Sequence, residues 1–227
     1  MSDAGLREQA GEPIRTVQID VVSDAVCPWC YIGKRHLEAA LAELPDVAAT
    51  IHWRPYQLDP TIPPGGLDRR AYMARKFGEE RLPDIHARLT EAGRAAGLDL
   101  AFDRIKRSPN TLDAHRLIRW AWSAGRQDAV VEALFRAFFI DGEDIGDREI
   151  LAARAAEAGM DREIVSRLLN EDADVDAVRD EIEKARSLGV TGVPFFILDG
   201  HLGVSGAQPP VVGGGAIAKV LEPAEQA

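Results

Sequence analysis

Cys27 and Cys30, three residues apart, are the side chains of this sequence best suited to covalent chemistry. They are the only cysteines among 227 residues, and they lie in SDAVCPWCYIGKRHLEAAL, where a helical pattern begins. Thiols at positions i and i+3 of a helix start are close enough to form a disulfide within one turn. Three interpretations are open: a redox pair, half of a metal site, or two thiols used as small hydrophobic side chains.

The place of each thiol on this helix predicts its role. Unpaired backbone N–H groups and the helix dipole favour an anion at a helix N-terminus. We therefore expect Cys27, at the exposed mouth, to be the nucleophile that attacks a disulfide. Leu37, Leu41 and Leu44 mark an apolar stripe that leads back to Cys30. Cys30 is expected to face the core, to keep its proton longer and to resolve the mixed disulfide formed at Cys27.

The other two interpretations account for fewer of these features. Zinc takes four ligands, or three and a water, and the pair supplies two. His36 lies about 240° around the helix from Cys30, whereas His52, on the next predicted strand, is not excluded by spacing. Two hydrophobic thiols would explain Cys30 but not Cys27. A C-x-x-C motif beside a β-α-β pattern in a cytosolic chain is typical of a redox site.

The elements that must position the pair follow from hydrophobic periodicity. Strands are predicted over 16–24 and 49–58, on either side of the cysteine helix, which should close at PD in 45–46. After the loop DPTIPPGGL, residues 67–187 carry helical patterns for six or seven helices. Their candidate N-caps are Asp68, Thr111, Asp147 and Asp161. Asp199-Gly200 predicts a hairpin, and a last helix follows it, weakened by three consecutive glycines in 213–215. The helical insert must pack against this α/β unit.

Pro194 is a second unusual feature. It stands at the entry of VPFFILDG, a run of strand-forming residues, and proline cannot donate to a sheet ladder. A cis Val193–Pro194 bond would explain its presence, since cis prolines mark tight turns. The alternative is a trans proline at the start of an edge strand.

Composition limits the compartment and the partners. The net charge is −10 with acidic and basic residues interleaved, so we expect no nucleic-acid partner. No stretch approaches a membrane span, and the polar N-terminal residues lack the apolar core of a signal peptide. The chain is therefore predicted to be cytoplasmic and not membrane-bound. Structural disulfides are rare in that compartment.

Several segments together resemble the DsbA family of thioredoxin-fold proteins, in particular its FrnE-like cytoplasmic branch. They are VVSDAVCPWCYIGK, RPYQLDP, NTLDAHRL, GVTGVPFFILDG and VSGAQP, within a match over 17–211. The resemblance implies an α/β thioredoxin fold with a central mixed sheet, interrupted by a large all-helical insertion domain. The expected division is a disordered tail over 1–15, a discontinuous thioredoxin-like domain over 16–64 and 188–223, and the insertion over 65–187.

The resemblance also carries over site residues. Cys27, Cys30 and Pro194 match the family's motifs, with Pro28 and Trp29 as the dipeptide that tunes the thiols. The family's fold places the loop before the last strand pair beside the cysteine helix. The Val193 backbone could therefore pair with an extended substrate.

Two further positions are weaker candidates. In this superfamily the start of the helix that holds NTLDAHRL can face the active site, which makes Asn110 and His115 candidate pocket residues. The alternatives are a cap or turn residue for Asn110 and an ordinary amphipathic position for His115.

These features predict a dithiol–disulfide oxidoreductase or isomerase acting on protein or small-molecule disulfides. It would need no bound cofactor or metal, with a cellular thiol as reductant, glutathione as a candidate co-substrate, and a monomeric or homodimeric state. The alternative is a glutathione-dependent isomerase or transferase that resembles the 2-hydroxychromene-2-carboxylate isomerases or kappa-class transferases, which need no resolving cysteine. A third interpretation, a thioredoxin-like binding module, is disfavoured by the intact C-x-x-C.

Overall fold

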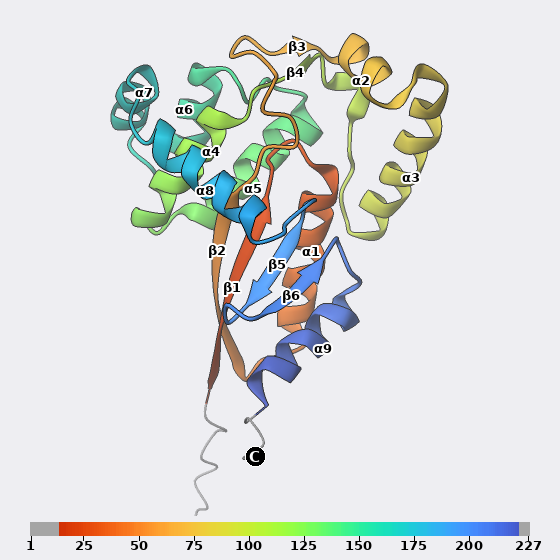
Figure 1. Ribbon diagram of the computed structural model, residues 1–227, viewed down its shortest axis with the longest axis vertical. Coiled ribbons are helices and arrows are strands. Elements are labelled where there is room, and N and C mark those ends of the chain that lie inside the picture. Colours follow the sequence, from red (N-terminus) through yellow and green to blue (C-terminus); the bar gives the residue numbers. More distant parts are fainter. Residues whose placement is uncertain (1–13, 223–227) are drawn as a thin grey trace, which may run out of the picture.

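The computed structural model describes residues 14–222 and is built on a four-stranded mixed sheet (Figure 1). In spatial order the strands are β2 (Val47–Pro55), β1 (Arg15–Ser23), β5 (Phe195–Leu198) and β6 (Leu202–Ser205). β1 and β2 are parallel, whereas β5 runs antiparallel to both of its neighbours, β1 and β6. The first two strands thus come from the start of the chain and the last two from its end.

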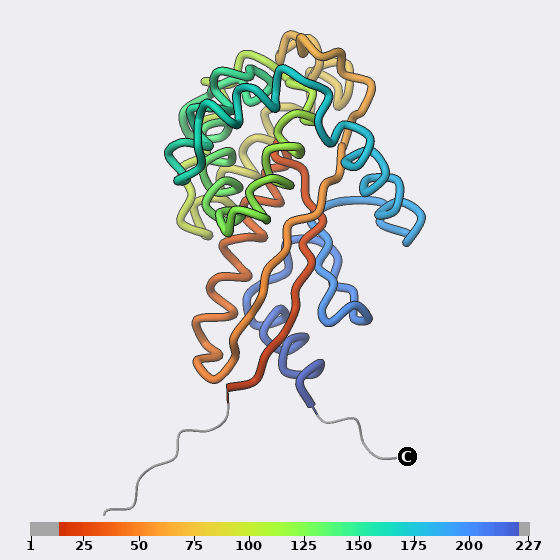
Figure 2. Tube along the Cα trace, turned by 90° about the vertical axis from the view of Figure 1, so that its left-hand side faces the viewer, coloured from red at the N-terminus to blue at the C-terminus, as the bar shows by residue number. Residues whose placement is uncertain are grey.

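Helices cover the sheet in two groups. α1 (Pro28–Ala42) follows β1 and packs against α9 (Pro210–Leu221). The other α-helices lie between β2 and β5 in the chain, at the end of the sheet where β1 stops and α1 begins (Figure 2). They are α2 (Arg69–Phe77), α3 (Leu82–Ala95), α4 (Leu112–Ser123), α5 (Gln127–Arg136), α6 (Arg148–Glu157), α7 (Arg162–Asn170) and α8 (Val175–Ser187). The expectation of six or seven helices in this stretch is confirmed.

Shorter elements connect these helices. β3 (Leu67–Asp68) and β4 (Arg107–Ser108) form a separate antiparallel pair. Two 3₁₀ turns span Glu79–Arg81 and Phe102–Arg104, and a π-helical turn spans Ala137–Asp141.

Within residues 14–222, no helix combines the length and apolarity that crossing a membrane would require.

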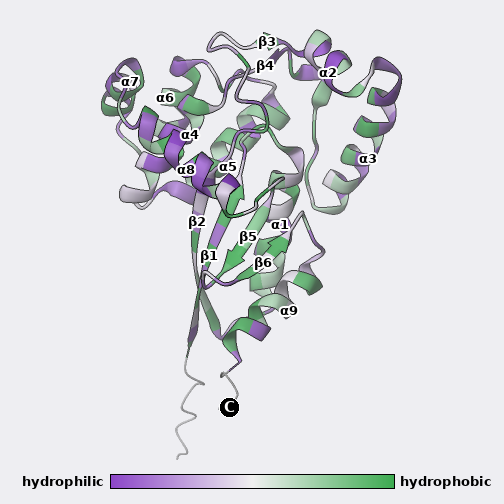
Figure 3. Ribbon diagram, viewed as in Figure 1, coloured by the Kyte–Doolittle hydropathy of each residue, from purple (hydrophilic) through white to green (hydrophobic). Residues whose placement is uncertain are grey.

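One hydrophobic cluster joins the sheet to the helical insert. It contains Ile19 and Val21 of β1 together with Leu117 of α4 and Phe135 of α5, all at most 1% exposed. In Figure 3, β5 and β6 are mostly hydrophobic, while α7 and α8 carry hydrophilic stretches. The insert therefore packs against the α/β unit, as its apolar stripes require.

The open edge of β2 is capped by a side chain of the insert. The amide of Gln127 accepts from the Trp53 N–H at 2.8 Å and donates to the Trp53 carbonyl at 3.1 Å. A glutamine at the start of α5 thus replaces the ladder bonds that a further strand would make, which protects the edge of the sheet.

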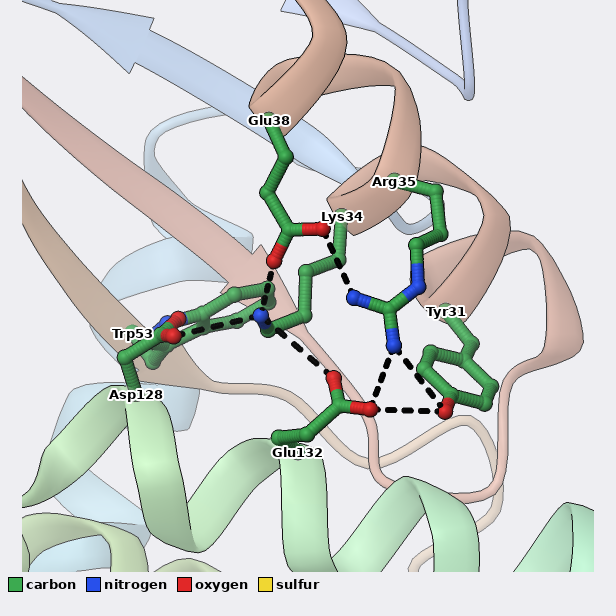
Figure 4. A network of polar contacts seen from close by, with 7 residues as sticks. All are labelled: Tyr31, Lys34, Arg35, Glu38, Trp53, Asp128 and Glu132. Atoms are coloured by element: carbon green, nitrogen blue, oxygen red, sulfur yellow. Dashed lines mark hydrogen bonds and ion pairs between the residues drawn. The ribbon is translucent and has the colours of Figure 1, made fainter. Parts of the chain in front are cut away.

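An ionic network fixes α1 to α5 (Figure 4). The side chain of Lys34 is 4% exposed and pairs with Glu38, with Asp128 at 3.1 Å and with Glu132 at 3.4 Å. Arg35 also pairs with Glu132, which in addition accepts from the Tyr31 hydroxyl at 2.9 Å. Because a buried ammonium is costly unless it is paired, these contacts fix the position of the cysteine helix relative to the insert.

The local start signals of the helices hold in most cases. Asp68, Asp147 and Asp161 each accept a hydrogen bond from a backbone N–H of the helix that they cap. Thr111 occupies the N-cap of α4 without a side-chain bond. Instead, Asn110 Oδ1 accepts from the Leu112 N–H at 2.9 Å, so the residue before the cap satisfies the backbone.

Three boundaries differ from expectation. The predicted tail over 1–15 overlaps β1, because Arg15 pairs with Val47 across the parallel ladder; residues 1–13 lie outside the described range. β2 lies two to three residues earlier than predicted, and α1 already ends at Ala42.

α9 forms through the triple glycine. Its Ile217 is 1% exposed within the main hydrophobic cluster, and this burial offsets the cost of about 1 kcal/mol per glycine.

Candidate active site

Cys27 is the N-cap residue of α1. Its backbone is extended, with φ −93° and ψ 113°, and Pro28 occupies the first helical position. Proline suits that position because its fixed φ is helical and its missing N–H would have no helical partner. The Cys27 carbonyl accepts from the N–H groups of Cys30 at 3.0 Å and Tyr31 at 3.4 Å. The predicted helix start at the C-x-x-C motif is therefore confirmed.

The expectation that Cys27 lies at an exposed mouth is wrong. Its side chain is buried, with 4% exposed, and its Sγ lies 3.5 Å from the carbonyl oxygen of Val193, to which it donates. Val193 is 166 residues away in the chain. Helical periodicity reports only on neighbours along the chain, so it could not reveal this cover.

Cys30 lies deeper than Cys27, at 1% exposed. Burial raises its pKa well above the usual value, and the hydrogen bond with Cys27 acts in the same direction. Hydrogen bonds to the Ser23 side chain and the Asp24 backbone oppose this increase. Cys30 is therefore protonated at neutral pH, as expected for the inner thiol.

The segment before β5 closes over α1. The peptide bond between Val193 and Pro194 is cis. On α1, a Cβ placed on Gly33 would lie 3.0 Å from Pro194 Cγ and 3.3 Å from Phe196 Cζ. Glycine at this position thus allows the helix and the proline segment to touch.

A cavity of about 320 Å³ adjoins Cys27. Pro28 and Trp29 belong to its wall on the α1 side, where Trp29 remains 40% exposed, and Val193 belongs to it on the β5 side. The opposite wall comes from α2, α3 and the loops beside them, which stand next to the start of α1 in Figure 1. It includes Leu58, Ile62, Arg69, Tyr72, Met73, Phe77, His86, Leu89 and Phe102. Cys27 therefore faces a largely apolar pocket, whereas Cys30 is not among its lining residues.

Asn110 and His115 are not among the residues that line this cavity. Asn110 braces loops, since it donates to the Ile62 carbonyl at 2.6 Å and accepts from the Gln57 amide at 3.1 Å. His115 is 3% exposed, and its Nε2 lies 2.9 Å from the Tyr56 carbonyl oxygen and 3.3 Å from Asp24 Oδ1. Both side chains serve buried backbone and side-chain contacts, and a role in the reaction stays a prediction.

The histidines considered as metal ligands have other neighbours. His52 stacks on Trp122 at 3.9 Å between ring centroids, and burial lowers its pKa to about 4. His36 Nδ1 lies 2.9 Å from the Gln208 carbonyl oxygen. Across residues 14–222, no three His, Cys, Asp or Glu side chains converge as a metal site would need.

Sequence reasoning missed the residues that the insert contributes. Arg69, Tyr72 and His86 line the cavity although they follow Cys27 by 42 to 59 residues. Helical periodicity in α2 marks an apolar face but does not say which neighbour this face meets. Asp24, also in the wall and 1% exposed, had a local signal, because a carboxylate directly after a buried strand is unusual.

Comparisons with known proteins agree with this geometry. Residues 18–213 match the family model of the DSBA-like thioredoxin domain. The crystal structure of the probable DsbA oxidoreductase SCO1869 from Streptomyces coelicolor is 34% identical, with 93% of each chain covered and a TM-score of 0.84. The protein YwbO from Bacillus subtilis (strain 168) is 28% identical over 184 residues, which cover 81% of this chain and 87% of YwbO.

A more distant structure shares the fold. The structure of 2-hydroxychromene-2-carboxylate isomerase is 16% identical, with a TM-score of 0.68 and coverage of 89% of this chain and 95% of that chain. The predicted fold class, a thioredoxin-like α/β unit with a helical insertion, is confirmed.

Proposed function

The chain belongs to the DSBA-like thioredoxin domain family and is a thiol–disulfide oxidoreductase, and we propose that Cys27 and Cys30 are its dithiol. Cys27 is the nucleophile and Cys30 the resolving thiol. The observation that carries this assignment is the asymmetry of the pair. Cys27 lines the cavity, whereas Cys30 is 1% exposed and carries a raised pKa.

The exchange proceeds in two balanced steps. The Cys27 thiolate attacks one sulfur of a substrate disulfide, and the other sulfur leaves as a thiolate. Cys30 then loses its proton and attacks the Cys27 sulfur, which forms the Cys27–Cys30 disulfide and releases the second substrate thiolate. The substrate gains two electrons and, after protonation, two protons, and the protein loses the same number.

The segment 193–194 supports substrate binding in this proposal. Val193 lies before the sheet ladder, which begins at Phe195, so its backbone can pair with an extended substrate beside Cys27. Pro194 holds the segment against α1 through the contact at Gly33. Pro28 and Trp29, between the thiols, complete the rim of the cavity.

We assign the parts of the chain accordingly. The thioredoxin-like unit, 16–64 and 188–223, carries the cysteines, and the insertion over 65–187 supplies most of the far wall of the cavity. Returning the oxidised pair to the dithiol takes two electrons, for which a cellular thiol such as glutathione is the proposed source. A cytoplasmic location fits this choice because thiols are kept reduced there.

A trapping experiment tests the roles of the two cysteines. Cys30→Ser protein incubated with insulin should accumulate a mixed disulfide through Cys27, because serine cannot resolve it. Mass spectrometry of the adduct under non-reducing conditions identifies the linkage. Cys27→Ser is the matched control and should form no adduct. Adducts through Cys30 in the control, or none in Cys30→Ser, would contradict the assignment.

The glutathione-dependent isomerase or transferase is the second candidate. A small-molecule cavity lined by Cys27 but not by Cys30 favours it. It predicts that Cys30→Ser keeps full isomerase or transferase activity with glutathione. The dithiol mechanism predicts that the same variant loses multiple-turnover disulfide reduction. The trapping preparation therefore decides between the two.

A further inference from the structure

Arg69, at the start of α2, is a cation without an acidic partner in the wall of the cavity. It is half-buried, and its recorded contacts are the Ser108 hydroxyl at 3.4 Å and the Phe138 ring at 5.8 Å. Among residues 14–222, no carboxylate pairs with it. Burial lowers the pKa of Arg69 to about 10, and only Tyr72 acts in the opposite direction. Arg69 is therefore charged at neutral pH.

Two cations that are buried more deeply than Arg69 are fully compensated. Lys34 has three carboxylates around its ammonium. Arg116 pairs with Asp113 and donates to four backbone carbonyls. A charge removed from water is costly unless it is paired. Arg69 departs from this pattern, which indicates that its counter-charge comes from a ligand.

The acidic residues of the same cavity are already engaged. The Asp59 carboxylate accepts from the Thr61 N–H and hydroxyl and from the Tyr72 hydroxyl at 3.0 Å. Asp24 accepts from the Leu58 N–H at 2.8 Å through one oxygen, whereas its other oxygen, 3.3 Å from His115 Nε2, is buried without a hydrogen-bond partner. Lys76, the other lining cation, is exposed and donates to the Tyr72 hydroxyl. Neither carboxylate pairs with Arg69, so its guanidinium remains open to a ligand anion.

The remaining surface of the cavity suits a flat apolar body. His86 stacks on Phe102 at 4.9 Å between centroids and 7° between planes, and burial keeps its pKa below the usual value. Its Nε2 is buried without a partner. Trp29, Tyr72 and Phe77 add aromatic walls. A volume of about 320 Å³ lies at the lower end of the roughly 300–1,000 Å³ of small-molecule sites.

We propose that this cavity binds a low-molecular-weight aromatic disulfide that bears a carboxylate, with Arg69 as the residue that recognises the carboxylate. The inference rests on the proposed function and names a substrate class for the same site. A guanidinium binds a carboxylate through two parallel N–H···O bonds. The aromatic body would then lie between Arg69 and Cys27.

The reaction is the exchange described above, with the aromatic thiolate as leaving group. Cys27 forms a mixed disulfide with one half of the substrate while the other half leaves. Cys30 displaces the second half, so one aromatic disulfide becomes two aromatic thiols as the dithiol becomes a disulfide.

Two probes and three variants test this selectivity. The rate of reduction is measured for carboxylated dithiobis(nitrobenzoate), followed by the absorbance of the released thiolate, and for uncharged dithiodipyridine, followed by the absorbance of the released thiopyridone. Arg69→Gln should slow the carboxylated probe about tenfold or more, which is the scale of a charge-assisted bidentate contact. The rate with the uncharged probe should stay within about twofold, since that ring makes no such contact. Arg70→Gln is the matched control, because the Arg70 side chain is 86% exposed and pairs with Glu79; it should leave both rates unchanged.

Other outcomes would contradict either the recognition of the carboxylate by Arg69 or the proposed function itself. Equal slowing of both probes by Arg69→Gln, or slowing of neither, contradicts recognition of the carboxylate while leaving the dithiol intact. Equal slowing by Arg70→Gln shows a general effect of surface charge and also contradicts it. If the wild-type protein reduces neither probe, the proposed function fails together with the inference. Arg69→Lys keeps the charge but loses the two parallel N–H donors of the guanidinium. Its rate with the carboxylated probe should therefore fall between those of wild type and Arg69→Gln.

Discussion

Cys27→Ser is expected to lower the rate of disulfide reduction by at least about a thousandfold. A serine hydroxyl is not ionised near neutral pH and does not attack a disulfide. The remaining Cys30 does not substitute for it, because Cys30 is 1% exposed, does not line the cavity and holds its proton. Turnover with insulin and dithiothreitol, followed by turbidity, measures the effect.

The fold of this variant should be unaffected. Serine is close to cysteine in size, and the Val193 carbonyl remains as a hydrogen-bond acceptor at the same position. An unchanged thermal midpoint therefore separates lost chemistry from lost structure. Activity above a tenth of wild type in a folded Cys27→Ser protein would show that another group performs the attack.

Arg116→Met is expected to destabilise the protein by about 3–5 kcal/mol. The guanidinium is 1% exposed. It donates to the carbonyls of Leu168, Glu171 and Ala173, each at 2.6 Å, where α7 ends and its last carbonyls have no helical partner. Methionine has a similar volume but no donor, so these buried oxygens would be left unsatisfied. Urea denaturation measures the loss.

Arg119→Met is the matched control on the same helix. Arg119 lies one turn after Arg116, and its side chain is 40% exposed where it pairs with Asp174 and Glu181. Pairs at exposed positions contribute about 0–1 kcal/mol, so the control should lose no more than that. Equal losses in the two variants would contradict the role given to the buried guanidinium.

Local chemistry made much of the sheet unit predictable from the sequence. Pro28 at the first helical position defines the start of α1. The hairpin forms at Asp199 and Gly200, which have φ values of 46° and 75°, as an Asp-Gly pair allows. These signals act over a few residues. The apolar stripe of α1 also made the burial of Cys30 and Leu37 predictable.

The candidate site was only half predictable, because its other half is non-local. The cover over Cys27 comes from Val193, and the opposite wall of the cavity comes from α2, α3 and the loops beside them. Periodicity marks the apolar faces of those helices but does not identify the partner of each face. The formation of α9 was underestimated for a similar reason, since the burial of Ile217 against other elements outweighs glycine's low helix propensity.

Whether Cys27 and Cys30 cycle together between dithiol and disulfide is measured most directly by mass spectrometry of the wild-type protein after one equivalent of a substrate disulfide. The peptide that contains both cysteines should lose two hydrogens, regain them with dithiothreitol, and carry no substrate adduct. A stable adduct on Cys27 with Cys30 still reduced, or no change in mass while substrate is consumed, would contradict the dithiol mechanism.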